Sequence, residues 1–200
     1  KIVDHYVSCF QKFGDTPKGL DWPNLEDLLK RYDVISDVVR SKENFSVLDF
    51  GCGTARMYPF LEEKFAQEFK YLGLDMGQEY VDHSKEKFPE LEFICGDVLA
   101  DKTIMPEVDY VLMNGVLTEK QTLSYEEMWD YTKALLAVIF EKANEGIAFN
   151  VMSKNVDWER EDLFHLSLDV LSEFLCNKLS RNFIIRNDYG LYEYTVYLYK

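Results

Sequence analysis

The stretch SVLDFGCGTA, at residues 46–55, joins a strand pattern to a glycine-rich turn. Its first five residues form a short, mostly apolar run of the kind found in strands buried on both faces. Gly51 and Gly53 follow at once, and a helical pattern runs from Met57 to Phe69. Glycines at such a junction let backbone N–H groups approach a ligand closely, beside the positive end of the helix dipole. The stretch therefore predicts a cofactor-binding loop.

Strand and helix patterns alternate through the rest of the chain. Further buried-strand patterns lie at residues 71–75, 91–95, 109–113, 146–152 and 182–186. Helical patterns lie at residues 78–88, 124–143 and 166–179, and Ser124 and Glu127 predict a capping box at the start of the second. This alternation indicates an α/β fold with a mostly parallel sheet and helices on both faces. The turn signal at residues 187–190, before alternating apolar residues at 192–198, adds a terminal antiparallel β-hairpin, so we predict a Rossmann-like sheet of seven strands. The tyrosines of the last strand alternate as on a half-exposed strand.

The length and the charge limit the class of protein. The chain has 200 residues, 47% of them hydrophobic, which is enough for one core, so we expect a single domain over residues 1–200. Lys and Arg number 22 and Asp and Glu 36, which gives a formal net charge of -14. Proteins that bind nucleic acid or anionic membranes gather cations on their surface. The acidic balance therefore argues against both partners.

The cysteines and the apolar runs bear on location. Cys9, Cys52, Cys95 and Cys176 are far apart and form no C-x-x-C pair, a pattern typical of a reduced compartment. The longest apolar run, at residues 134–140, is much shorter than a membrane span, and no basic-then-apolar leader opens the sequence. We therefore predict a cytoplasmic protein.

Two acidic residues follow later strands of the predicted sheet. Asp75 ends the second strand, 22 residues after Gly53, where its carboxylate can accept both hydroxyls of a ribose. Gly96 and Asp97 follow the third strand, where the aspartate can meet the exocyclic amine of an adenine. All of these positions lie at carboxyl ends of strands, which is the edge where open α/β sheets bind ligands.

With these residues in place, residues 44–200 resemble the class I S-adenosylmethionine-dependent methyltransferases. The glycine motif of that family is matched by Asp49, Gly51 and Gly53, with Ala55 in place of the customary third glycine. The resemblance implies that S-adenosylmethionine is the cofactor, that Met76 packs on its adenine, and that Asn114 faces its methionine part. The implied cofactor site consists of Phe50, Gly51, Cys52, Gly53, Ala55, Asp75, Met76, Gly96, Asp97, Val98, Asn114, Gly115 and Val116.

Three other functions are alternatives to methyl transfer. A nicotinamide dinucleotide needs a third glycine close to its pyrophosphate, at the position that Arg56 occupies here. An aminopropyl transferase on the same fold has an acidic motif after the fourth strand, where this chain has Asn114 and Gly115. A non-catalytic partner subunit that binds S-adenosylmethionine remains the alternative to an enzyme.

The acceptor site is expected where segments leave the same edge of the sheet. These segments are residues 114–122, 153–165 and 187–189, and by resemblance the N-terminal residues 1–43 form a helical lid over the site. The candidate acceptor-binding residues are Lys18, Trp22, Asn155, Trp158 and Tyr189. The four carboxylates of residues 157–162 disfavour a polyanionic acceptor. We expect a small-molecule acceptor, such as a sugar hydroxyl, and a monomer or homodimer.

His165 is the candidate general base, because its unperturbed pKa is near neutrality and a hydroxyl acceptor must lose a proton. The bland interpretation is that His165 only caps the helix that follows it. No set of His, Asp and Glu has convincing metal-ligand spacing, so no metal site is predicted.

Overall fold

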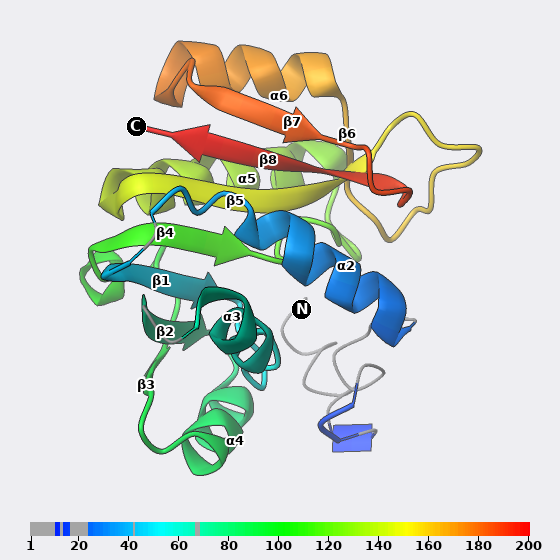
Figure 1. The fold of residues 1–200 in the computed structure, drawn as a ribbon. Coiled ribbons are helices and arrows are strands. Elements are labelled where there is room, and N and C mark those ends of the chain that lie inside the picture. Colours follow the sequence, from blue (N-terminus) through cyan, green and yellow to red (C-terminus); the bar gives the residue numbers. More distant parts are fainter. Residues whose placement is uncertain (1–10, 13, 17–23, 42, 67–68) are drawn as a thin grey trace.

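The computed structural model describes residues 11–12, 14–16, 24–41, 43–66 and 69–200. The strands are β1 (Phe45–Phe50), β2 (Phe69–Asp75), β3 (Glu92–Cys95), β4 (Val108–Met113), β5 (Ala143–Ser153), β6 (His165–Leu166), β7 (Phe183–Arg186) and β8 (Glu193–Tyr199). They form one sheet in the order β3-β2-β1-β4-β5-β8-β7, and β6 pairs with β5 beside this path (Figure 1). Among the described strands, β8 runs in the opposite direction to all the others. The predicted Rossmann-like sheet with its terminal hairpin is confirmed, and the two-residue strand β6 is an addition.

The helices lie in two layers, one on each face of the sheet (Figure 1). The helical elements are α2 (Leu25–Ser36), α3 (Met57–Phe65), α4 (Gln78–Lys87), the 3-10 turn η2 (Lys102–Ile104), α5 (Tyr125–Lys142), α6 (Leu168–Phe174) and the π-helical turn η3 (Leu175–Leu179). α2, α3 and α4 bury apolar side chains in one core, and α5, α6 and η3 bury theirs in the other. Both faces of the central strands are therefore covered, as the apolar runs in the sequence require.

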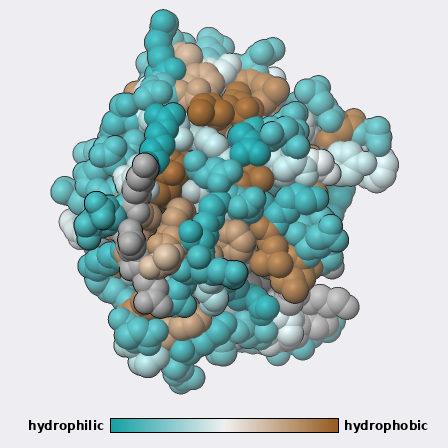
Figure 2. Space-filling view, viewed as in Figure 1, coloured by the Kyte–Doolittle hydropathy of each residue, from teal (hydrophilic) through white to brown (hydrophobic). Residues whose placement is uncertain are grey.

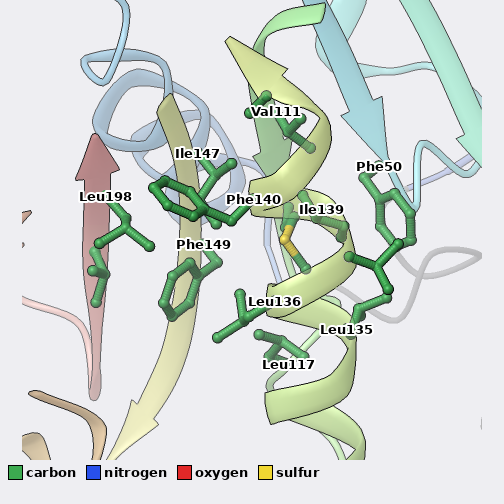
Figure 3. Close-up of a cluster of buried hydrophobic side chains, with 14 of the residues drawn as sticks. Phe50, Val111, Leu117, Leu135, Leu136, Ile139, Phe140, Ile147, Phe149 and Leu198 are labelled. Atoms are coloured by element: carbon green, nitrogen blue, oxygen red, sulfur yellow. The ribbon is translucent and has the colours of Figure 1, made fainter. Parts of the chain in front are cut away.

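α5 is the main helix of the second core (Figure 3). Its residues Leu135, Leu136 and Ile139 pack in one cluster with Ile147 and Phe149 of β5, and each of these side chains is at most 1% exposed. Burying a side chain of this size stabilises the fold by roughly 1.5–3 kcal/mol. This packing holds β4 and β5 in place, and the loop between β4 and α5 leaves the sheet at its carboxyl edge.

The N-terminus of α5 is the helix end that the sequence predicted most closely. Ser124 accepts a hydrogen bond from the Glu127 N–H at 3.1 Å, and the Glu127 carboxylate accepts one from the Ser124 N–H at 2.8 Å. This reciprocal pair is a capping box, and it satisfies two N–H groups that the helix itself leaves unpaired. The predicted box is confirmed.

Two other predictions differ from the structure. The predicted helix over residues 57–69 ends at Phe65, because Ala66 takes a left-handed conformation with φ +50° and β2 already begins at Phe69. The last strand was expected to be half-exposed, yet every residue of β8 is buried. β8 lies between β5 and β7, so helices cover both of its faces and the alternation of its tyrosines does not mark a solvent-facing side.

Figure 2 shows hydrophilic side chains over much of the molecular face seen in Figure 1, with apolar side chains gathered in smaller areas between them. Within the described residues, no helix is both long enough and apolar enough to cross a membrane.

Candidate functional site

The glycine loop, residues 50–55, turns sharply between β1 and α3. Gly51 and Gly53 have φ values of +74° and +53°, which other residues rarely adopt. A Cβ atom on Gly51 would lie 2.7 Å from Cγ2 of Val116 in the loop after β4. The absence of a side chain at Gly51 therefore lets the loops after β1 and β4 approach each other. The predicted members Gly51, Gly53 and Val116 lie together at the carboxyl edge of the sheet.

The N–H groups of the glycine loop are used differently from the prediction. Those of Gly51 and Cys52 donate to the Leu74 carbonyl at 2.7 and 3.1 Å, and that of Gly53 donates to Asp75. The sequence interpretation had directed them at a ligand. In this structure they tie the loop to the end of β2 instead, so the loop contributes close approach of its backbone rather than donors.

Asp75 joins this loop to the start of α4. Its Oδ2 accepts from the Gly53 N–H and its Oδ1 from the Gly77 N–H, both at 2.8 Å. Burial raises the pKa of the Asp75 carboxyl, and the backbone hydrogen bonds from Gly77 and Gly53 oppose that rise. Each carboxylate oxygen has a further lone pair, so the carboxylate can still accept from a ligand. The next residue, Met76, is 43% exposed and presents an apolar side chain beside it.

The turn after β3 continues the same edge. The Gly96 N–H donates to the Asp75 carbonyl at 3.0 Å, which joins the ends of β2 and β3. Asp97 accepts from the Leu99 N–H at 2.8 Å, so its side chain is held by the turn, and Val98 is buried in the core. The predicted cofactor residues from three strands, β1, β2 and β3, are thus neighbours in space.

A polar group that no described residue satisfies follows the end of β4. Oδ1 of Asn114 is buried and has no hydrogen-bond partner among the described residues. Leaving a buried carbonyl oxygen unpaired costs roughly 1–3 kcal/mol. A ligand that carries an ammonium or hydroxyl group could satisfy it, as S-adenosylmethionine would. The residues present therefore fit the cofactor that the sequence predicts.

A buried carboxylate lies in β1, immediately before the glycine loop. Asp49 is 2% exposed and accepts a hydrogen bond from the Tyr71 hydroxyl at 2.8 Å. Burial raises the pKa of Asp49 to about 7, the hydrogen bond from Tyr71 opposes this, and the nearby charge of Asp75 adds to the rise. The charge behind the glycine loop therefore changes near neutral pH.

One described part of the predicted lid touches the glycine loop. Asp15 accepts from the Thr54 hydroxyl at 2.6 Å, from Arg56 Nη1 at 3.0 Å and from Lys87 Nζ at 2.7 Å. Partial burial raises the pKa of Asp15, but the hydrogen bonds from Lys87 and Thr54 and the nearby cations outweigh it and lower this pKa to about 2. Arg56, which argued against a dinucleotide in the sequence, thus binds the N-terminal segment.

Backbone hydrogen bonds join two of the three segments expected to build the acceptor site, and a further one ties them to the chain just after the third. The N–H groups of Lys120 and Gln121 donate to the Asp162 carbonyl at 3.0 and 2.9 Å, which fastens the loop after β5 to the loop after β4. The Ser153 N–H donates to the Tyr192 carbonyl at 3.0 Å, which joins the end of β5 to the hairpin before β8. The predicted convergence of these segments at one edge is what the structure shows.

The structure describes three of the five candidate acceptor-binding residues, and these differ in exposure. Lys18 and Trp22 lie outside the described residues. Asn155 is exposed, and Trp158 is 72% exposed on the loop after β5. Tyr189 is half-buried and its hydroxyl lies 2.9 Å from the Thr195 hydroxyl. Their roles in binding an acceptor stay predictions.

The geometry of His165 favours a structural role over that of a base. The ring is 5% exposed, and Nδ1 lies 2.6 Å from the Ser153 carbonyl, so Nδ1 carries the proton. Nε2 accepts from the Arg160 N–H at 3.3 Å. Both ring nitrogens are thus engaged with the backbone of the loop after β5, and His165 does not cap the helix but forms β6. To accept a proton from a substrate, it would have to give up a hydrogen bond.

Three residues that the sequence analysis missed form a buried network beside this site. Asn150 of β5 and Glu193 of β8 are 1% and 2% exposed, and Arg31 of α2 donates from Nε to both Glu193 oxygens at 3.0 and 2.9 Å. A signal for Asn150 existed, because it is the one amide inside the apolar strand pattern at 146–152. Glu193 carried no such signal, because its strand was interpreted as half-exposed.

The described residues contain no cluster of three or more His, Cys, Asp or Glu side chains that could hold a metal ion.

Comparison with known proteins shows which proteins share this domain and fold. Residues 47–139 match the family described as a methyltransferase domain, which spans β1 to most of α5 and includes the glycine loop, Asp75, Asp97 and Asn114. The Mycobacterium tuberculosis protein named "Putative methyltransferase Rv1506c" is 26% identical over 170 residues, covering 82% of this chain and 98% of that protein.

Solved structures share the fold. Magnesium protoporphyrin IX methyltransferase from Synechocystis PCC 6803, solved with bound S-adenosylmethionine, has a TM-score of 0.61 at 16% identity, covering 86% of this chain and 79% of its own. A TehB-like S-adenosylmethionine-dependent methyltransferase from Corynebacterium glutamicum has a TM-score of 0.59 at 14% identity, covering 100% of this chain and 98% of its own. Together these findings support a class I S-adenosylmethionine-dependent methyltransferase.

Proposed function

We propose that this enzyme transfers the methyl group of S-adenosylmethionine to a small-molecule acceptor, at a hydroxyl of a sugar or related metabolite. The assignment of S-adenosylmethionine as the cofactor is supported by the buried Oδ1 of Asn114, which has no hydrogen-bond partner among the described residues. Asn114 lies in the loop that packs on the glycine loop through Val116. In the proposed site, Asp75 binds the ribose hydroxyls, Asp97 the adenine amine, and Asn114 the methionine part.

The proposed reaction requires the protein mainly to align the acceptor with the methyl group. The sulfonium of the cofactor already activates the methyl group for in-line displacement by a nucleophile. The chain then has to hold the acceptor at the right distance and angle and to exclude water, which are positioning effects. The loops after β4 and β5 and the hairpin before β8 are joined by backbone hydrogen bonds, and this supports a fixed acceptor site between them.

Charge supports a neutral or cationic acceptor over a polyanion. Asp157 and Glu161 are exposed on the loop after β5. Their neighbours Glu159 and Asp162 are paired with Lys154 and Arg160 of the same loop, so the cations of this loop are already matched by carboxylates. The net negative charge here would repel a phosphorylated acceptor, whereas it would not repel a neutral sugar hydroxyl.

The test is methyl transfer from S-adenosylmethionine labelled on its methyl group. We would incubate the purified chain with separate panels of sugars, phenols, amines and carboxylic acids, and follow label in the product and S-adenosylhomocysteine formation. Asp75→Ala serves as the control that lacks the proposed ribose contact. We expect labelled product in a panel that offers hydroxyl groups. Transfer confined to amines or carboxylates would refute the hydroxyl acceptor, and tight cofactor binding without transfer to any panel would favour the non-catalytic partner subunit.

A further inference from the structure

Two side chains hold Gly115 in the loop after β4. Gly115 has φ +78°, a conformation that favours glycine. Its N–H donates to Oδ1 of Asn150 at 2.8 Å, and its carbonyl accepts from the Thr118 hydroxyl at 2.9 Å. Side chains therefore fix both polar atoms of Gly115, directly beside Asn114.

Asn150 can hold this peptide in only one orientation. Its Oδ1 must face the Gly115 N–H, which is a donor, and its Nδ2 donates to Oε1 of Glu193 at 3.0 Å. Reversing the amide would place a donor against a donor and an acceptor against an acceptor. Glu193 thus determines how the side chain of Asn150 is turned.

Glu193 is in turn held by α2. Nη2 of Arg31 lies 2.8 Å from Oε2 of Glu193, and the two side chains are 11% and 1% exposed. Burying an ion pair costs desolvation that the attraction between the charges barely offsets, so such a pair adds little stability over apolar residues. Its position gives it another use, because the chain of contacts runs from α2 through β8 and β5 to the peptide next to Asn114.

We propose that Asn150 and Glu193 are positioning residues, which fix the Gly115 peptide and thereby aim the Asn114 carboxamide at the cofactor. Arg31 supports them by holding the Glu193 carboxylate. This inference rests on the proposed cofactor site, but its first link is the hydrogen bond from the Gly115 N–H to Asn150.

The network allows an exchange of donor and acceptor as a test. Asn150→Asp places a second carboxylate against Glu193, and Glu193→Gln leaves Arg31 facing an amide donor. Each single variant should weaken binding of S-adenosylhomocysteine about tenfold, which corresponds to the loss of one buried hydrogen-bond partner. The double variant restores a donor at position 193 and an acceptor at position 150 with the same total charge. It should return the affinity to within about twofold of the wild type.

A second measurement separates positioning from general stability. Hydrogen exchange and the chemical shift of the Gly115 amide, followed by NMR in the ligand-free chain, should change in both single variants and recover in the double variant. Tyr194→Phe is the matched control: its buried hydroxyl donates to the Leu166 carbonyl at 3.1 Å, and Tyr194 packs in the core on the α5 and α6 side of β8. This control should lose stability and keep both the Gly115 amide signal and the affinity.

The outcomes distinguish this inference from the proposed function. If the wild type binds S-adenosylhomocysteine and the single variants bind it equally well, or if the double variant shows no recovery, the positioning role is wrong and the cofactor assignment stands. If the wild type does not bind it, the proposed function fails, and the Gly115 amide still reports on the first link. A single variant that does not fold leaves the other single variant and the double variant to decide recovery, and an unfolded double variant counts against the inference.

Discussion

The two halves of the candidate site are held together over very different distances along the chain. In the cofactor half, at the ends of β1, β2 and β3, Gly53 and Asp75 are hydrogen-bonded at a separation of 22 positions. In the acceptor half, the end of β5 meets the start of β8, and the network proposed to position Asn114 also lies there. Arg31 and Glu193 are paired across 162 positions, and Asn150 and Glu193 across 43. Both halves lie at the carboxyl edge of one sheet (Figure 1).

Short sequence motifs can therefore predict one half of the site better than the other. A strand, a turn and a helix place glycines and carboxylates by their own geometry, so the cofactor half follows from short motifs. The acceptor half depends on which strand lies beside which and on what covers them, and no short motif carries that information. Variants in each half test whether the two halves also differ in what they contribute to stability and binding.

The largest effect is expected in the cofactor half, at Asp49. The pKa of this carboxyl is raised from 3.8 to about 7 in the folded protein, so the native state holds a proton more tightly than the unfolded chain does. The stability that this proton gives is complete below about pH 4 and is lost as the pH rises through about 7. The loss amounts to about 4 kcal/mol in the ligand-free protein. Urea unfolding at a series of pH values between 4 and 8 measures it.

Two variants at this pair check the cause. Asp49→Asn cannot ionise, so its free energy of unfolding should lack this fall with pH. Tyr71→Phe removes the hydrogen bond that lowers the pKa of Asp49, so the fall should move to higher pH. An unchanged pH profile in Asp49→Asn would show that the carboxylate is not the source.

A smaller effect is expected in the acceptor half, at His165. His165→Ala removes the partners of the Ser153 carbonyl and the Arg160 N–H, which should lower the free energy of unfolding by about 1–3 kcal/mol. Binding of S-adenosylhomocysteine should stay within about twofold of the wild type, because none of the proposed cofactor contacts is touched. Chemical denaturation and calorimetry measure the two quantities.

The opposite result at His165 would restore the sequence interpretation. Full stability in His165→Ala, together with loss of methyl transfer to an identified acceptor, would mean that the histidine works as a base after all. His165→Asn adds a control, because an amide can replace one of the two hydrogen bonds but cannot take up the proton.

The smallest effect is expected at Ala55, where the glycine motif departs from its usual pattern. Ala55 has φ +55°, which costs an alanine about 1–2 kcal/mol and a glycine much less. Ala55→Gly should therefore stabilise the protein by at most about 1 kcal/mol, because the greater freedom of glycine in the unfolded chain offsets part of the gain. Ala66→Gly is the matched control outside the site, since Ala66 has φ +50° at the end of α3. If neither variant gains stability, the left-handed backbone is not strained at these positions.

Particular residues show how far sequence reasoning reached and where it stopped. The mostly parallel sheet with its terminal hairpin, the capping box of α5 and the meeting of the glycine loop with Asp75 follow from local patterns, and the structure contains them. Burial of β8 could not be inferred, because Tyr194 and Glu193 alternate as on a half-exposed strand while both sides are covered. The hydrogen bonds of His165 could not be inferred for a related reason: its partners, the Ser153 carbonyl and the Arg160 N–H, are backbone atoms that the sequence does not display.

The central claim is that the ends of β1 to β4 form a site for S-adenosylmethionine with Asp75 at its ribose. Calorimetry with S-adenosylhomocysteine tests it most directly, using the wild type, Asp75→Ala and the remote control Asp101→Ala, whose exposed aspartate accepts from the Thr103 N–H at the start of η2. The account predicts that the wild type and Asp101→Ala bind alike, and that Asp75→Ala loses about 1–3 kcal/mol of binding free energy. A wild type that does not bind S-adenosylhomocysteine, that prefers NAD, or that binds no better than Asp75→Ala would contradict it.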